Sequence, residues 1–211
     1  MDHKLTLHCF AGDPQSLAIL LLAQFTEARL ATRYLKPINL TEKLYKSSLT
    51  KTFPMLQLEQ GDKSIFVERS MAILRHVARL NDNGRLYNEA NAFEASLVDQ
   101  ILDSVYQEVL PAVMTLNAHS LGFLELEEEQ LAEVTADLAA CLPGLDRSVA
   151  RLPARVTLAD FPLLALWLVL KRQPQAGKLV APLKNFAQRI DLLLQDKAFA
   201  ALARPHLLRV Q

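Results

Sequence analysis

Two side chains near the start of the chain are of types that can attack a substrate. Cys9 carries a thiol and Ser16 a hydroxyl, and both are candidate catalytic residues. A cysteine attacks as a thiolate, so it needs a neighbour or a positive field that lowers its pKa. His8 precedes Cys9, but adjacent residues of a strand point to opposite faces, so no Cys–His pair is predicted. Cys9 is therefore either a nucleophile for mixed-disulfide chemistry or a small buried residue, and Ser16 either reaches the site or is a solvated helix residue.

Ser70 is a candidate for binding rather than for attack. It begins an amphipathic pattern that predicts a helix over residues 70–80. A serine at a helix N-terminus either caps the helix or offers its hydroxyl, together with the free amides of the first turn, to a carboxylate. The sequence is compatible with both interpretations of Ser70.

The cysteines and histidines indicate neither a metal site nor a disulfide framework. The two cysteines, Cys9 and Cys141, are far apart and form no CxxC motif, and the five histidines follow no ligand spacing. Structural zinc sites and disulfide scaffolds need closely spaced ligands or several cysteine pairs. We therefore expect no bound metal.

The composition describes a folded protein with no overall charge. Of the 211 residues, 51% are hydrophobic and 22% charged, and 23 basic residues balance 23 acidic ones. This excludes a disordered chain and a strongly basic nucleic-acid binder. The apolar stretches are too short to cross a bilayer, and the first residues do not form a secretory signal, so we expect a cytoplasmic protein. Acidic residues predominate over 83–150 and basic ones over 151–211, which indicates either complementary surfaces or ordinary solvation.

The elements that must position these residues change in type along the chain. Alternating apolar residues predict strands at the start, and a proline after Asp13 predicts the first turn of a helix. From residue 89 onward only helical spacing remains, and Pro111 is expected to kink a long helix rather than end it. The expected strands are 4–8, 30–35, 53–58 and 64–67. The expected helices are 14–25, at most one short helix before residue 52, 70–80, a long helix from residue 89 that continues past Pro111, 127–142, 157–171 and 183–194.

Four local motifs, in this order, resemble the glutathione transferase superfamily over nearly the whole chain. They are LHCFAGDPQSLAILLLA at 7–23, Phe53-Pro54, RSMAILR at 69–75 and TLAD at 157–160. The resemblance implies an α+β protein with a thioredoxin-like βαβ-ββα domain over 1–82 and an all-helical domain over 88–211.

The resemblance also implies a binding site for glutathione. A cis bond at Phe53-Pro54 would leave the Phe53 N–H and C=O free to pair with the tripeptide as a strand does. Ser70 would hold a carboxylate. In the TLAD motif the Thr157 side chain would cap the N3 amide while Asp160 reaches back, which is a folding device.

Three positions depart from the pattern of the family's enzymes. Cys9 stands where the tyrosine-type enzymes place their tyrosine, and Asp13 where the serine and cysteine types place their catalytic residue. An aspartate would repel a thiolate. Arg69 stands where an acidic or amide residue pairs with the amino group of glutathione, and it would oppose that ammonium. The chain is therefore expected to need no cofactor, with glutathione as its only candidate ligand.

Within the superfamily, residues 53–80 and 183–205 most resemble the transferase-like domain of the translation elongation factor 1 gamma subunit and similar domains of aminoacyl-tRNA synthetase complexes. That resemblance implies a non-catalytic docking domain, bound to protein partners of the translation apparatus or to a second copy. The rival interpretation is a divergent glutathione transferase or glutathione-dependent thiol reductase. Candidate interface residues are Arg75, Arg79 and Arg85, with Glu94, Asp99 and Asp103.

The basic end of the chain offers an alternative contact with tRNA. Base-stacking aromatic residues are nearly absent from it, which argues against direct RNA recognition. The basic side chains in question are Lys171, Arg172, Lys178, Lys184, Arg189, Arg204 and Arg209.

Overall fold

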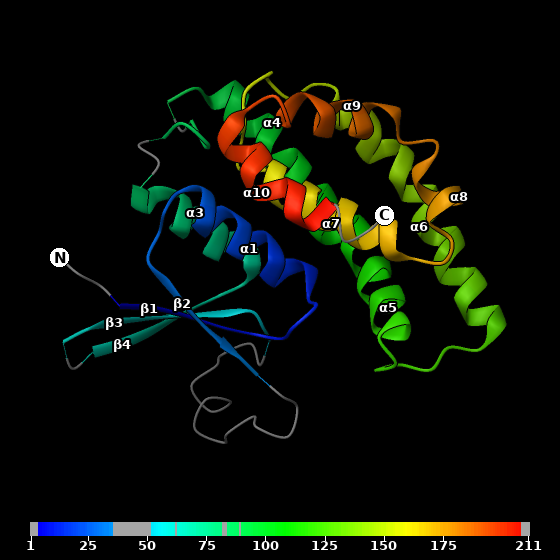
Figure 1. Cartoon of the computed structure of the whole chain (residues 1–211), viewed down its shortest axis with the longest axis horizontal. Helices are drawn as coiled ribbons and strands as arrows, with labels where there is room; N and C mark the ends of the chain where they lie inside the picture. The colour runs from blue at the N-terminus through cyan, green and yellow to red at the C-terminus, as the bar shows by residue number, and fades with distance from the viewer. Residues whose placement is uncertain (1–3, 36–51, 62, 82–83, 89, 208–211) are drawn as a thin grey trace. The chain divides into compact units, whose positions relative to one another are not determined.

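The computed structural model describes residues 4–35, 52–61, 63–81, 84–88 and 90–207 (Figure 1). The short helix that the sequence allows before residue 52 lies outside the described residues. The chain forms two compact units, Met1–Arg85 and Leu86–Gln211.

The first unit is built on a four-stranded sheet in the order β2-β1-β3-β4. β1 pairs in parallel with β2 and antiparallel with β3, and β3 pairs antiparallel with β4. Every second residue of β1 (Leu5, Leu7 and Cys9) is buried, as the alternating pattern predicts. The strands are β1 Lys4–Cys9, β2 Leu30–Tyr34, β3 Met55–Gln60 and β4 Lys63–Glu68.

Two helices, α1 (Pro14–Phe25) and α3 (Ser70–Asn81), lie side by side on one face of this sheet (Figure 1). Asp13 is the N-cap of α1, and the helix has a proline in its first turn, as expected from the sequence. The side chains of Ile19, Leu22 and Ile73 are fully buried. Packing of these apolar faces fixes the positions at which the two helices begin.

The second unit is helical throughout its described part. Its central element is α7, in which each residue from Asp160 to Leu170 is buried, as a helix surrounded by other helices requires. Its elements are α4 Ala92–Asp103, the π-helix η2 Ser104–Val109, α5 Leu110–Ser120, α6 Glu128–Val149, α7 Asp160–Arg172, α8 Ala176–Val180, α9 Lys184–Leu193 and α10 Lys197–Leu207.

Two prolines shape the helices in ways that differ from the expected bounds. Before Pro111 the chain widens into the π-helix η2, which accommodates the ring and the missing N–H, and the helix continues as α5. Pro143 was expected to follow the end of a helix, but α6 runs through it to Val149. Because Pro143 is exposed, water can satisfy the carbonyl that loses its partner.

The TLAD motif holds the start of α7, with one difference from the expected pairing. The Asp160 carboxylate accepts hydrogen bonds from the Thr157 N–H at 2.7 Å and from the Thr157 hydroxyl at 2.9 Å. The hydroxyl therefore donates to the carboxylate instead of capping the N3 amide, which bonds to the Thr157 carbonyl. The expected contact of the threonine with that amide is thus wrong, and the reach of Asp160 back to Thr157 is confirmed.

Arg189 of α9 completes this buried cluster. Its guanidinium donates to both oxygens of Asp160, at 2.8 Å and 2.6 Å, and to the carbonyls of Pro153 and Arg155. The side chains of Asp160 and Arg189 are 0% and 4% exposed. Arg189 is therefore not available to contact tRNA, and its inclusion among the candidate tRNA-contacting residues is wrong.

Within the described ranges no helix is long and apolar enough to cross a membrane.

Candidate functional site

The strand register brings the motifs of the first unit to one end of the sheet. His8 of β1 lies opposite Met55 of β3, and Met55 lies opposite Glu68 of β4. The residues that follow β1 and β4 and precede β3 therefore meet at this end. Cys9 ends β1 there, Phe53 and Pro54 precede β3, and Arg69 and Ser70 follow β4.

Cys9 is unsuited to nucleophilic chemistry. Its side chain is fully buried. Burial raises the pKa of the Cys9 thiol to about 11; the nearby Asp13 carboxylate adds to the rise and the Ser16 hydroxyl opposes it. At neutral pH this thiol is almost entirely protonated, and a thiol is neither nucleophile nor strong leaving group. Of the two alternatives for Cys9, the geometry supports the buried residue.

The N-terminus of α1 is already occupied by a carboxylate of the chain itself. Asp13 accepts hydrogen bonds from the Gln15 N–H at 3.2 Å and the Ser16 N–H at 2.9 Å, and from the Ser16 hydroxyl. Burial raises the pKa of the Asp13 carboxyl, while these hydrogen bonds lower it. Ser16 is buried rather than solvated, and its hydroxyl proton is held by Asp13. Neither the hydroxyl nor these amides are free to stabilise a substrate anion.

The N-terminus of α3 is open by comparison. The Arg69 carbonyl accepts from the Ile73 N–H at 3.1 Å, so Arg69 is the N-cap residue. An arginine side chain has no acceptor and cannot cap the first amides of the helix. Ser70 is 5% exposed, and its hydroxyl donates to Oε1 of Gln15 at 2.5 Å, which joins the starts of α3 and α1. Within the described part of the chain, no side chain caps the N–H groups in the first turn of α3.

Phe53 supplies backbone groups at the same end of the sheet. The Phe53–Pro54 bond is cis, which confirms the isomer implied by the resemblance. Among the described residues, no hydrogen bond uses the Phe53 N–H or C=O. The ring of Phe53 packs edge-on against Phe10, with centroids 5.4 Å apart. The site therefore combines an unpaired backbone donor and acceptor with an anion-binding helix terminus.

Gln15 is a residue of the candidate site that the sequence did not single out. Glutamine in a first helical turn carries no particular pattern, and its bond to Ser70 spans 55 residues. Only the packing of α1 against α3 reveals the contact.

The candidate interface residues do not form a free acidic row. The carboxylate of Glu94 is paired with the guanidinium of Arg155, and Asp99 accepts from the Tyr87 hydroxyl at 2.7 Å. Asp103 accepts from Gln107 at 3.4 Å. Arg75, Arg79 and Arg85 all have interactions within the chain. A role of these residues in pairing stays a prediction.

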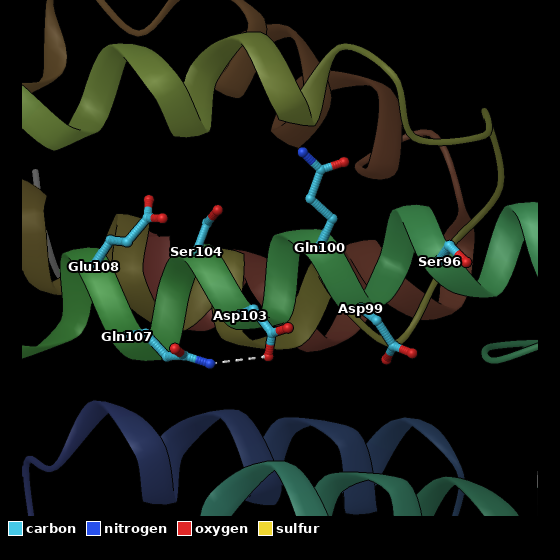
Figure 2. A pocket seen from close by; sticks show the side chains of 7 residues that line it. All are labelled: Ser96, Asp99, Gln100, Asp103, Ser104, Gln107 and Glu108. Carbon is cyan, nitrogen blue, oxygen red and sulfur yellow. Dashed lines mark hydrogen bonds between the residues drawn. The ribbon is translucent and has the colours of Figure 1, made fainter.

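Figure 2 shows a hollow on the polar face of α4 and η2. Its volume is about 530 Å³. The side chains of Gln100, Ser104 and Glu108 point to one side of the helix, and those of Asp99 and Asp103 to the other. Three of its lining residues are carboxylates, which would repel an anionic ligand such as glutathione. Nor does any group of three metal-ligating side chains occur in the described part of the chain. The site in the first unit is therefore the better candidate.

Comparison with solved structures identifies the fold. The chain superposes on glutathione transferase URE2P6 from Phanerochaete chrysosporium, solved with oxidised glutathione, with a TM-score of 0.78, 16% identity and coverage of 99% and 98% of the two chains. The maleylacetoacetate isomerase of Anaeromyxobacter dehalogenans, solved with glutathione in its active site, gives 0.70, 15% identity and 95% coverage of both chains. The chain has the glutathione transferase fold.

A third structure, glutathione S-transferase-I bound with lactoylglutathione, gives a TM-score of 0.76 at 15% identity, covering 95% of this chain and 99% of that one. No protein-family model and no curated protein sequence matches the chain. The predicted fold class, a thioredoxin-like sheet domain followed by a helical domain, is confirmed. The three solved structures are two glutathione transferases and an isomerase, and they do not support the more specific resemblance to translation proteins.

Proposed function

We propose that the chain is a divergent glutathione transferase that binds glutathione at the end of the sheet where α1 and α3 begin. The observation that carries the proposal is that two binding features lie at the same end of the sheet. One is the open N-terminus of α3, held in place by the Ser70–Gln15 bond, and the other is the backbone of Phe53, whose N–H and C=O have no partner among the described residues. Backbone amides at a helix N-terminus favour a carboxylate, and an unpaired strand residue favours an extended peptide. The neighbours solved with glutathione compounds support the same ligand class.

The site is suited to binding glutathione but not to ionising its thiol. A cysteine thiol has a pKa of about 8.5, so a transferase must supply a donor or positive field to ionise it. Here the start of α1 holds the Asp13 carboxylate, which uses the Ser16 hydroxyl and the first amides for itself. We therefore propose that the chain binds glutathione specifically but conjugates it to electrophiles slowly. The buried Cys9 also disfavours a thiol reductase that would use this residue.

A docking role in the translation apparatus, with protein partners or a second copy, stays a prediction that rests on local sequence resemblance. Contact with tRNA and a cytoplasmic location likewise stay predictions. No contact within the described residues favours them over glutathione binding.

Replacing Ser70 tests the proposal. Ser70→Ala removes the hydroxyl and its bond to Gln15, and we expect the dissociation constant for glutathione to rise about fivefold to tenfold, as for loss of one hydrogen bond near a charged ligand. Isothermal titration calorimetry of the whole chain measures this change directly.

The control is Ser96→Ala, because Ser96 is an exposed serine of α4 that bonds only to the Ala92 carbonyl of its own helix. This variant is expected to bind glutathione like the unmodified chain. Absence of binding heat from the unmodified chain, or equal affinity in the Ser70→Ala variant, would rule the proposal out.

A further inference from the structure

We infer that Arg69 sets the ligand preference of this site, so that it favours a glutathione-like thiol whose acyl end carries a carboxylate but no ammonium. The inference rests on the proposed function, because it concerns the same site. Arg69 discriminates between ligands that share the cysteinyl-glycine part and differ only in the ammonium group of the acyl end.

The first step is the location of the ligand's carboxylate. Two helices begin at this end of the sheet, and their N-termini differ in charge. The Gln15 and Ser16 amides of α1 are bonded to the Asp13 carboxylate, whereas α3 begins at Ser70 with a cation at its N-cap position and with no cap from any side chain that the structure describes. An anionic group is therefore drawn to α3 and repelled from α1.

The second step follows from the chemistry of glutathione. Its γ-glutamyl residue carries a carboxylate and an ammonium on the same carbon atom, whereas the second free carboxylate, on the glycine, has no ammonium beside it. In the proposed complex the γ-glutamyl carboxylate binds the first turn of α3, and its ammonium then lies near Arg69, the residue before Ser70. Two cations at that separation repel each other, and removal of the ammonium relieves the repulsion while keeping the carboxylate.

The third step concerns Arg69 itself. Its side chain is exposed, and within the described ranges no ion pair neutralises its guanidinium. Its backbone has φ 74°, in the left-handed region where glycine and asparagine are the residues with the smallest cost. An arginine at such a position is unfavourable for folding alone, and a ligand contact gives it a use.

The test compares glutathione with glutaryl-cysteinylglycine, which is glutathione with the amino group replaced by hydrogen. By titration calorimetry the unmodified chain is expected to bind the desamino compound about fivefold more tightly. Arg69→Glu is expected to reverse this ratio in favour of glutathione. Arg69→Asn, which removes the charge and tolerates a positive φ, is expected to bring the ratio close to one.

Arg29→Glu is the matched control, since it makes the same change of net charge at an exposed arginine just before β2, at the opposite end of the sheet. Its affinity ratio should equal that of the unmodified chain. Binding of glutathione as tightly as or more tightly than the desamino compound, or an unchanged ratio in Arg69→Glu, overturns the inference and leaves the proposed function standing. Failure of both compounds to bind overturns both.

Discussion

Replacing Asp160 with alanine is expected to lower the free energy of unfolding by about 3–5 kcal/mol, the cost of leaving one member of a buried ion pair without its partner. Asp160 and Arg189 are both buried, so the substitution leaves the guanidinium without the two bonds that it donates to the carboxylate. The Thr157 N–H also loses its acceptor. Urea denaturation followed by circular dichroism measures the change.

Asp137→Ala provides the comparison, because Asp137 is an exposed aspartate of α6 and its replacement should change stability by less than about 0.5 kcal/mol. If the Asp160→Ala chain does not fold, the cycle of Asp160→Asn, Arg189→Met and their combination gives the same information. The combined variant is expected to lose less stability than the sum of the single losses. Additive losses, or a loss from Asp160→Ala no greater than that of Asp137→Ala, would contradict a strong buried pair.

Replacing Asp13 with asparagine is expected to raise the rate of glutathione conjugation about tenfold. Asparagine keeps an oxygen that caps α1, so the helix start is retained. The change removes a negative charge close to the expected position of the glutathione thiolate, and a charge about 5 Å away in a partly buried site acts on the order of 1–3 kcal/mol. The substitution also releases the Ser16 hydroxyl, which in the unmodified chain donates to the Asp13 carboxylate. The measurement is kcat/KM with a reactive aryl halide at neutral pH.

The source of the gain can be separated with a second substitution. Ser16→Ala in the Asp13→Asn background is expected to remove part of the increase, because the released hydroxyl is then absent. Asp137→Asn serves as the control for a distant change of charge. Equal rates in the unmodified chain and in Asp13→Asn would show that Asp13 does not suppress thiol activation.

Local patterns were sufficient to predict most of the first unit. Alternation in β1, the proline after Asp13 and the amphipathic spacing after Ser70 each depend on neighbouring residues, and the structure has the expected elements there. The cis bond at Phe53–Pro54 followed from the family resemblance and not from the residues alone.

Contacts between distant segments could not be predicted in this way. Gln15 meets Ser70 because α1 packs against α3, and Arg189 meets Asp160 because α9 packs beside the start of α7. Arg189 was grouped with basic surface residues, since a sequence does not reveal which charges are buried. Likewise, the run of α6 through Pro143 depends on the exposure of that residue, which only the packing of the helix decides.

The most direct test of glutathione binding in the first unit is a titration of the isotope-labelled chain with glutathione, followed residue by residue in amide NMR spectra. We predict that the largest shifts occur at the Phe53, Ser70 and Met71 amides and at the side-chain amide of Gln15. Shifts confined to the hollow on α4 and η2, or no shifts at millimolar glutathione, would contradict the account.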